Sequence, residues 1–223
     1  MAEHLFPTKS VDAISPQLAS FFSEEQLRFD LYEGTVVDGT GTRVIYVSTD
    51  LLRGIHAALS HEAGPAWKTI LRRCGELWGR RMYKQSSRQV PALLGERLDR
   101  LKVPDLLAFL SAYFAMHGWG QLRIDLAPSS EHGAVWAYLK YSLLNEALRD
   151  GEQRVDYLVA GMLAGFFSEL SGCQLGCLQL AGKQGADDQS VFLVSGSERL
   201  QTLFESDADE WDARDVLRRL YCA

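Results

Sequence analysis

Few residues in this sequence combine types and spacings that would support catalysis. The four cysteines stand at positions 74, 173, 177 and 222. The chain has 223 residues and starts without the basic and apolar regions of a signal peptide, so the cysteines do not indicate a disulfide framework. It contains no glycine-rich dinucleotide fingerprint, phosphate loop or nucleophile elbow. A reductase would also need a hydride source, and no nicotinamide or flavin signature is present. The sequence therefore favours a binding protein over an enzyme.

Two glycines, Gly161 and Gly165, lie four residues apart in an apolar segment with helical spacing. Residues four apart share one helix face, so the pair leaves a patch without side chains. Each glycine costs about 1 kcal/mol of helix propensity relative to alanine. Close approach of a helix, a strand or a ligand would compensate for this cost. Ordinary helix–sheet packing and ligand contact both remain open.

Hydrophobic periodicity predicts a single α+β domain with helices packed on mainly antiparallel strands. The predicted helices cover residues 48–63, 65–83, 104–118 and 155–170, with shorter ones ending at residue 22 and spanning 211–221. The predicted strands cover residues 27–32, 44–47, 119–126, 134–141, 173–180 and 191–194, the first two forming a hairpin that turns at 38–41. We divide the chain into an N-terminal extension (1–25), a main domain (26–196) and an acidic helical tail (197–223).

Charge and hydropathy exclude two classes of protein. The net charge of −6 argues against binding to nucleic acid, which requires cations that neutralise phosphates. No apolar stretch is long enough to span a bilayer, so we expect a cytoplasmic protein. One stretch, residues 68–102, holds ten Lys/Arg and three acidic residues. A solvated helix face explains this stretch, and a docking patch for an anionic ligand, lipid headgroup or acidic partner is the alternative.

Residues 156–170 resemble the signature helix of the 4-vinyl-reductase-type family, which carries two glycines four apart. In that family a β-hairpin follows with a cysteine in its first strand, here residues 173–180 and 190–194. Gly118-Trp119-Gly120 and the strand that carries Trp136 also match. The resemblance is best over residues 117–195. The earlier helices resemble the larger fold of bacterial phenol-sensing regulators and small subunits of vesicle-tethering complexes, the ligand-binding fold of NO signalling and Golgi transport. This implies N-terminal helices packed on a twisted, mainly antiparallel sheet.

The resemblance also implies a zinc site, because some family members bind zinc through an acidic residue and cysteines at this helix and hairpin. Asp156, Cys173 and Cys177 are the candidate ligands here. The chain departs from the pattern, since Asp156 replaces a cysteine, Gln174 the acidic residue and Ser190 the last cysteine. Structural zinc sites normally have four ligands. We therefore expect a degraded site whose structural role has passed to packing.

A ligand cavity between the helices and the sheet is the further implication of the resemblance. Aromatic walls with one or two polar anchors would line it and favour a flat ring compound. The residues assigned to it are Tyr113, His117, Trp119, Trp136, Tyr138, Gly161, Gly165 and Phe166. Strand parity leaves an alternative, in which the tryptophans cover the rim of a dimer. His117 follows a helix end and has its own reason to be there, because the helix dipole favours it.

The function expected from this resemblance is a non-catalytic sensor or carrier of a hydrophobic ring compound. A tetrapyrrole, such as a chlorophyll precursor or a bilin, is the first ligand to test, because a related protein is encoded with bacteriochlorophyll-synthesis enzymes. The start Phe6-Pro-x-Lys9-Ser-Val-Asp12 resembles that of cyanobacterial members linked to photosystem assembly. This would place a homodimer near assembly proteins or at the surface of a photosynthetic membrane. The alternatives are a dimeric scaffold module without a ligand, with Trp78 and Trp136 at its interface, and a vinyl reductase.

Overall fold

The computed structural model describes residues 27–38, 41–127, 129, 133–148, 154–181, 189–205 and 216. The predicted helix that ends at residue 22 lies outside these residues. Of the predicted helix 211–221 only Val216 is described, and it is buried. Among the described helices, none is both long and apolar enough to cross a membrane.

A four-stranded antiparallel sheet forms the centre of the molecule, with strand order β4-β5-β7-β6. Its strands are β4 (Gln121–Asp125), β5 (Val135–Lys140), β6 (Leu175–Ala181) and β7 (Gln189–Gly196). The helices around it are α2 (Thr49–Ala63), α3 (Trp67–Leu94), α4 (Val103–Met116), α6 (Leu143–Ala147), α7 (Tyr157–Ser171) and α8 (Ser197–Glu205). Two 3₁₀ turns, η2 (Gly64–Ala66) and η3 (Leu98–Arg100), flank α3. The predicted α+β class, with helices packed on an antiparallel sheet, is confirmed.

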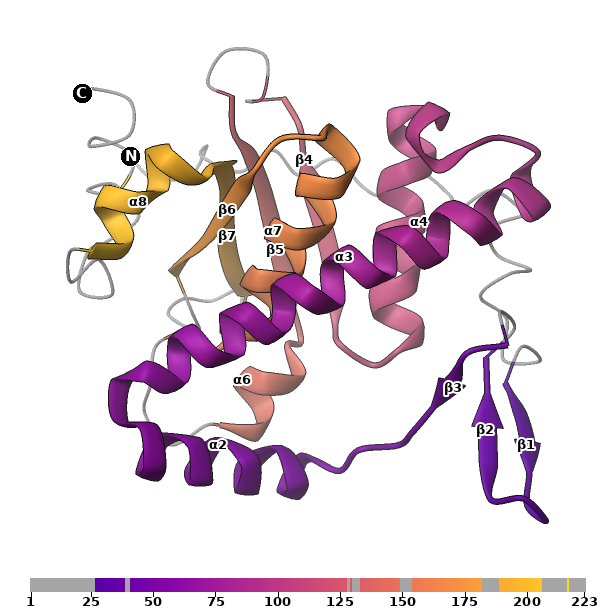
Figure 1. The fold of residues 1–223 in the computed structure, drawn as a ribbon, viewed down its shortest axis with the longest axis horizontal. Helices are drawn as coiled ribbons and strands as arrows, with labels where there is room; N and C mark the ends of the chain where they lie inside the picture. The colour runs from indigo at the N-terminus through magenta and orange to yellow at the C-terminus, as the bar shows by residue number, and fades with distance from the viewer. Residues whose placement is uncertain are drawn as a thin grey trace.

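The register of the sheet separates two hydrophobic layers. Leu122 pairs with Leu139, and both face the core beneath α3, α4 and α7. Arg123 pairs with Tyr138, which faces the opposite way, toward α8. In Figure 1 α3 crosses in front of α7 and the sheet, whereas α8 lies beside β6 and β7. The start of the predicted acidic tail thus packs on the same sheet through Leu200 and Leu203.

α3 is longer than the sequence predicted. The expected end was Tyr83, but Met82, Ser86 and Val90 continue the buried stripe at a spacing of four residues. Pro91 is accommodated in the last turn, and Gly95 ends the helix in the left-handed conformation with φ 70°. The short helix α6 was not predicted, and α8 lies in the segment assigned to the helical tail but before the expected helix 211–221. Ser142 caps α6 by accepting a hydrogen bond from the backbone N–H of Asn145 at 3.2 Å.

The N-terminal region forms a separate three-stranded antiparallel sheet of β1 (Arg28–Asp30), β2 (Thr35–Val37) and β3 (Arg43–Val44). The predicted two-stranded hairpin was wrong, because β2 lies between the two expected strands. The Asp30 carboxylate causes the earlier turn, accepting hydrogen bonds from the N–H groups of Tyr32 and Glu33 at 3.0 and 2.9 Å. Leu31, expected on a half-buried strand, is 90% exposed. This sheet lies apart from the central one in Figure 1.

Candidate functional site

Six rings gather where α3, α4 and the start of β4 meet, and we call them the aromatic cluster. They belong to Trp78, Phe109, Tyr113, Phe114, His117 and Trp119. The ring centres of Trp78 and Trp119 are 4.9 Å apart, and those of Tyr113 and His117 are 4.1 Å apart with nearly parallel planes. Phe109 and Phe114 are buried, while the other four side chains are partly exposed. The cluster thus has a buried apolar base and four side chains that are partly exposed.

Local backbone geometry brings three of these residues together. Tyr113 and His117 lie four residues apart on α4 and therefore share one face. The chain reverses after Gly118, whose φ of 71° is left-handed, and the N–H of Trp119 donates to the carbonyl of Phe114 at 3.0 Å. A Cβ at Gly120 would overlap the carbonyl oxygens of Lys140 and Tyr141 on the neighbouring chain segment. The Gly-Trp-Gly sequence is therefore required to fold Trp119 back onto α4.

His117 has a defined polar role within the cluster. Its Nδ1 lies 2.8 Å from the carbonyl oxygen of Tyr113. A carbonyl can only accept, so Nδ1 carries the hydrogen. In the neutral ring this leaves Nε2 as the acceptor nitrogen. His117 can therefore accept a hydrogen bond from a hydroxyl or N–H group on a molecule that stacks nearby.

The turn between β2 and β3 lies near enough to Tyr113 to influence its pKa. Burial raises the pKa of its phenol, a hydrogen bond from Trp78 opposes this shift, and the charge of Asp38 adds to it. Asp38 is itself buried, at the turn between β2 and β3. Gln85 of α3 donates a hydrogen bond to Thr42 in the same turn. The turn of the small sheet thus lies close to the cluster.

Trp136 and Tyr138 do not join this group, although both were assigned to one cavity with it. They lie on the outer face of β5, where their rings stack at 6.4 Å and contact the layer under α8. Arg123 lies over the Tyr138 ring at 5.2 Å. Burial raises the pKa of Tyr138 to about 12. The central sheet therefore separates these two rings from His117 and Trp119.

Gly161 and Gly165 contact the backbone of α3 and do not border open space. A Cβ at Gly161 would overlap the carbonyl oxygen of Arg72, and one at Gly165 that of Glu76. The contact is reciprocal, because a Cβ at Gly75 or Gly79 would overlap carbonyl oxygens of α7. Of the partners expected for this glycine face, a helix, a strand or a ligand, the structure shows a helix, whereas the helix–sheet packing weighed against ligand contact is not what these glycines make. Phe166 is fully buried against Tyr83 and Phe167.

The three predicted metal ligands do not come together. Asp156 precedes α7 and Cys173 follows it, so the length of the helix, about 22 Å for fifteen residues, separates them. Cys173 is exposed, whereas Cys177 is buried in the core, where burial raises the pKa of its thiol. The described part of the chain contains no group of three His, Cys, Asp or Glu residues that could hold a metal ion. This corrects the proposed ligand set.

Asp156 instead lies in a buried polar group with Ser142, Asn145, Gln179 and Ser190. Burial raises the pKa of its carboxyl, and hydrogen bonds from Ser142 and Ser190 oppose the shift. The sequence could not identify this group, because its members come from four separate elements.

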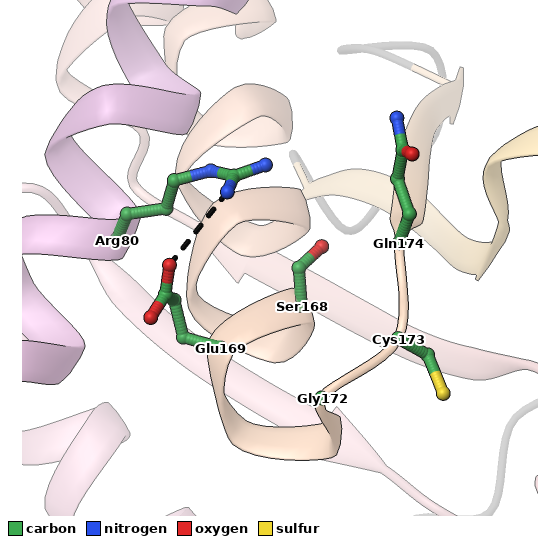
Figure 2. Close-up of a pocket in the computed structure, with 6 residues that line it drawn as sticks. All are labelled: Arg80, Ser168, Glu169, Gly172, Cys173 and Gln174. Atoms are coloured by element: carbon green, nitrogen blue, oxygen red, sulfur yellow. Dashed lines mark ion pairs between the residues drawn. The ribbon is translucent and has the colours of Figure 1, made fainter.

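One pocket lies at the opposite end of α7, with a volume of about 320 Å³. Its lining residues are Arg80, Ser168, Glu169, Gly172, Cys173 and Gln174. Figure 2 shows Arg80 extending from α3 toward Glu169 at 3.6 Å, while the sulfur of Cys173 points away from this ion pair. The polar, charged walls differ from the aromatic walls expected for a ring compound.

Two features of the site were missed in the sequence. Trp78 was placed on a helix but was expected only at a dimer interface, and no periodicity indicates that it meets Trp119. Gly75 and Gly79 repeat the four-residue spacing of Gly161 and Gly165 within a predicted helix. That second pair could have indicated a contact between the two helices.

Comparison with known proteins supports the fold. No protein-family model and no curated protein matches the chain. The phenol-responsive sensory domain of the transcription activator PoxR, solved with phenol, has a TM-score of 0.64 and 16% identity, covering 92% of this chain and 95% of that one. A trafficking protein particle complex subunit 3 from Naegleria fowleri, covalently bound to palmitic acid, has a TM-score of 0.46 and 17% identity (66% and 93% covered). A vinyl-4-reductase family protein from Methanocaldococcus jannaschii has a TM-score of 0.46 and 17% identity (68% and 83% covered). At 16% identity the likeness to the sensory domain shows the fold alone.

Proposed function

We propose that this protein is a non-catalytic sensor or carrier of a small hydrophobic molecule with an aromatic ring. The observation that carries the proposal is the aromatic cluster, in which the ring of His117 is held by its hydrogen bond to the Tyr113 carbonyl. Trp78, Tyr113, His117 and Trp119 are partly exposed aromatic side chains, and stacking of a ligand ring on one of them would contribute about 0.5–1.5 kcal/mol. The Nε2 of His117 supplies an acceptor for a hydroxyl on the bound ring. A phenol-like compound has both features.

The similarity to the phenol-responsive sensory domain supports phenol as the first probe. That domain is described with phenol bound, and it covers nearly the whole of this chain. At 16% identity the likeness does not transfer its binding residues. The cluster of this chain supplies the chemical reason to test the same class of molecule.

Isothermal titration with phenol and toluene tests the proposal, because toluene keeps the ring but has no hydroxyl. We expect phenol to bind more tightly than toluene to the wild-type protein. His117→Phe keeps a ring at position 117 and removes the acceptor. It should weaken phenol binding about tenfold, the value of one hydrogen bond, and leave toluene binding unchanged. Equal loss for both compounds, or phenol binding without any effect of this change, would contradict the proposal.

The tetrapyrrole and photosystem-assembly versions of this function stay predictions. Absorbance titration with protoporphyrin derivatives and bilins tests the first, and a spectral shift at micromolar protein would support it. Turnover of a vinyl-bearing porphyrin with an added reductant would instead support the reductase alternative. Co-purification of this protein with photosystem-assembly proteins from the native host would support the photosystem-assembly version.

A dimeric assembly module is the second candidate, favoured by exposed apolar side chains of the N-terminal region. Phe29 and Tyr46 stack at 6.1 Å, yet they are 55% and 70% exposed. Leu31, Tyr32 and Ile45 are also exposed, and apolar surface of this kind marks protein contacts. Light scattering should then report a dimer that Tyr46→Ser converts to a monomer. Tyr141→Ser, which changes an exposed tyrosine after β5, is the control and should leave the dimer intact.

A further inference from the structure

The buried polar group around Asp156 contains five residues, and we call it the Asp156 cluster. Its members are Ser142, Asn145, Asp156, Gln179 and Ser190. The side chains of Asp156 and Ser190 are fully buried, and Ser142 and Gln179 are nearly so. Buried carboxylates are costly unless every oxygen is paired, so the hydrogen bonds of this cluster decide its role.

Each oxygen of the Asp156 carboxyl accepts from the cluster. Oδ1 accepts from the Ser142 hydroxyl at 2.5 Å, and Oδ2 accepts from the Ser190 hydroxyl and from Asn145 Nδ2 at 3.2 Å. The backbone N–H of Asp156 donates to Gln179 Oε1 at 3.0 Å. Asp156 therefore uses both its carboxyl and its amide within the cluster.

The hydroxyl of Ser190 also uses all of its hydrogen-bonding sites within the cluster. Its hydroxyl donates to Asp156 and accepts from Asn145 Nδ2 at 2.8 Å and from Gln179 Nε2 at 3.2 Å. A hydroxyl has one donor and two acceptor sites, and all three are used. A fully satisfied network of this kind rigidifies the elements that it joins.

Four elements are joined by these bonds. Ser142 and Asn145 begin α6, Asp156 precedes α7, and Gln179 and Ser190 lie on the paired strands β6 and β7. The cluster therefore fixes the start of α7 to the β6–β7 hairpin and to α6. These are the helix and hairpin at which the family resemblance implies zinc. Positions 156 and 190, which were matched to cysteine ligands, are in direct contact.

The residues of the cluster do not fit a zinc ion. Structural zinc requires four thiolate, imidazole or carboxylate ligands, and here only one carboxylate is present among hydroxyl and amide groups. A metal would also have to break the hydrogen bonds that occupy both carboxyl oxygens. Gln179 is the glutamine that contacts Asp156, whereas Gln174, at the position matched to the family's acidic ligand, lines the pocket at the other end of α7.

We infer that the Asp156 cluster is a metal-free clamp that replaces a structural zinc ion and holds the start of α7 on the β6–β7 hairpin. The chain folds and stays folded without a divalent cation. A hydrogen-bond network performs the structural role that zinc would have at this position. The sequence had predicted that packing would perform it. This inference is independent of which molecule the aromatic cluster binds.

Thermal unfolding of the full chain with and without metal is the first test. The protein is measured after treatment with EDTA and after addition of zinc, while native mass spectrometry records any bound metal. We expect no stoichiometric zinc and a midpoint that changes by less than about 1 °C, because a metal bound only to the folded state would raise it. Bound zinc whose removal lowers the midpoint would overturn the inference.

Ser190→Ala tests the network itself, and Ser195→Ala is its matched control. Both serines are buried on β7, but the Ser195 hydroxyl lies outside the Asp156 cluster and donates to the Gly133 carbonyl at 3.1 Å. Ser190→Ala removes one hydrogen-bond donor to Asp156 and one acceptor each for Asn145 and Gln179. It should lower the midpoint by roughly 5–10 °C, against roughly 1–4 °C for the control. Equal shifts would overturn the inference.

Amide hydrogen exchange provides a milder test if Ser190→Ala does not fold. Gln179→Met keeps the length of the side chain and removes the acceptor of the Asp156 amide. We expect this amide to exchange at least about tenfold faster, because its hydrogen bond protects it. The Leu175 amide, bonded to Ser168 Oγ at the other end of α7, is the internal control and should not change. Unchanged exchange at Asp156, or equal change at both ends, would contradict a local clamp.

Discussion

α3 meets its neighbours in two contrasting ways. Gly75 and Gly79 bring its backbone against α7, where any added Cβ would overlap a carbonyl oxygen. Trp78, between them in sequence, turns toward Phe114 and Trp119, where aromatic side chains remain partly exposed. The first contact excludes even a methyl group, whereas the second leaves the rings of Trp78 and Trp119 partly exposed. The glycine pair thus marks the closed part of the fold, and the candidate binding surface lies at its edge.

Gly161→Ala should disrupt the backbone packing of α3 on α7 and produce the largest of the expected effects, a loss of unfolding free energy. The added methyl group overlaps the carbonyl of Arg72, so the helices must separate. Overpacking of this severity costs about 3 kcal/mol, and the higher helix propensity of alanine returns only about 1 kcal/mol. Urea unfolding measures the loss.

Gly54→Ala is the control for this change, because Gly54 lies in α2 with no atom within 4 Å of an added Cβ. It should leave stability unchanged or raise it by up to about 1 kcal/mol. If both alanine variants behaved alike, the backbone contact between α3 and α7 would not exist.

Trp119→Ala should weaken ligand binding at the aromatic cluster. The change in binding free energy should be smaller than the loss of unfolding free energy caused by Gly161→Ala. Removing one stacking partner should weaken phenol binding about tenfold. This factor corresponds to the upper end of the free energy that one aromatic pair contributes. Trp136→Ala is the matched change on the opposite face of the sheet and should leave the affinity unchanged. Titration calorimetry measures both, and a greater loss with Trp136→Ala would move the site to the outer face.

Tyr138→Phe should give the smallest effect, visible only at alkaline pH. The pKa of Tyr138 rises from 10.0 to about 12 in the folded protein, so folding favours the protonated phenol. Its contribution to stability is complete below pH 10 and is lost as the pH rises toward 12. The wild-type protein should therefore lose more stability than the variant between these pH values in urea unfolding. Parallel pH profiles would show that this ring is not held in a desolvated layer.

Local pattern was sufficient to predict the elements of the central body. The apolar spacing of residues 104–118 and 155–170 gave α4 and α7 within a few residues, and the alternation of Leu122 and Ile124 gave the inner face of β4. Strand parity also correctly indicated that Trp136 and Tyr138 lie on one face of their strand. The prediction failed for β2, because three residues are too few to show a period.

Contacts between residues far apart in the chain could not be predicted from the sequence. Asp156 meets residues 14, 11, 23 and 34 positions away, and nothing in their spacing indicates that they share one hydrogen-bond network. The cavity was placed beside Gly161 because an open glycine face and a helix contact have the same sequence pattern. Only the position of α3 separates these two interpretations.

The most direct test of the account follows the indole N–H signals of the five tryptophans by NMR during a phenol titration, with each signal assigned by substitution. The central claim is that a ring compound binds at the edge of α3 and α4 and not on the outer face of the sheet, where Trp136 lies. The signals of Trp78 and Trp119 should then shift together with one saturation curve, while that of Trp136 stays in place. Shifts confined to Trp136, or no shift of any tryptophan at millimolar phenol, would contradict the claim.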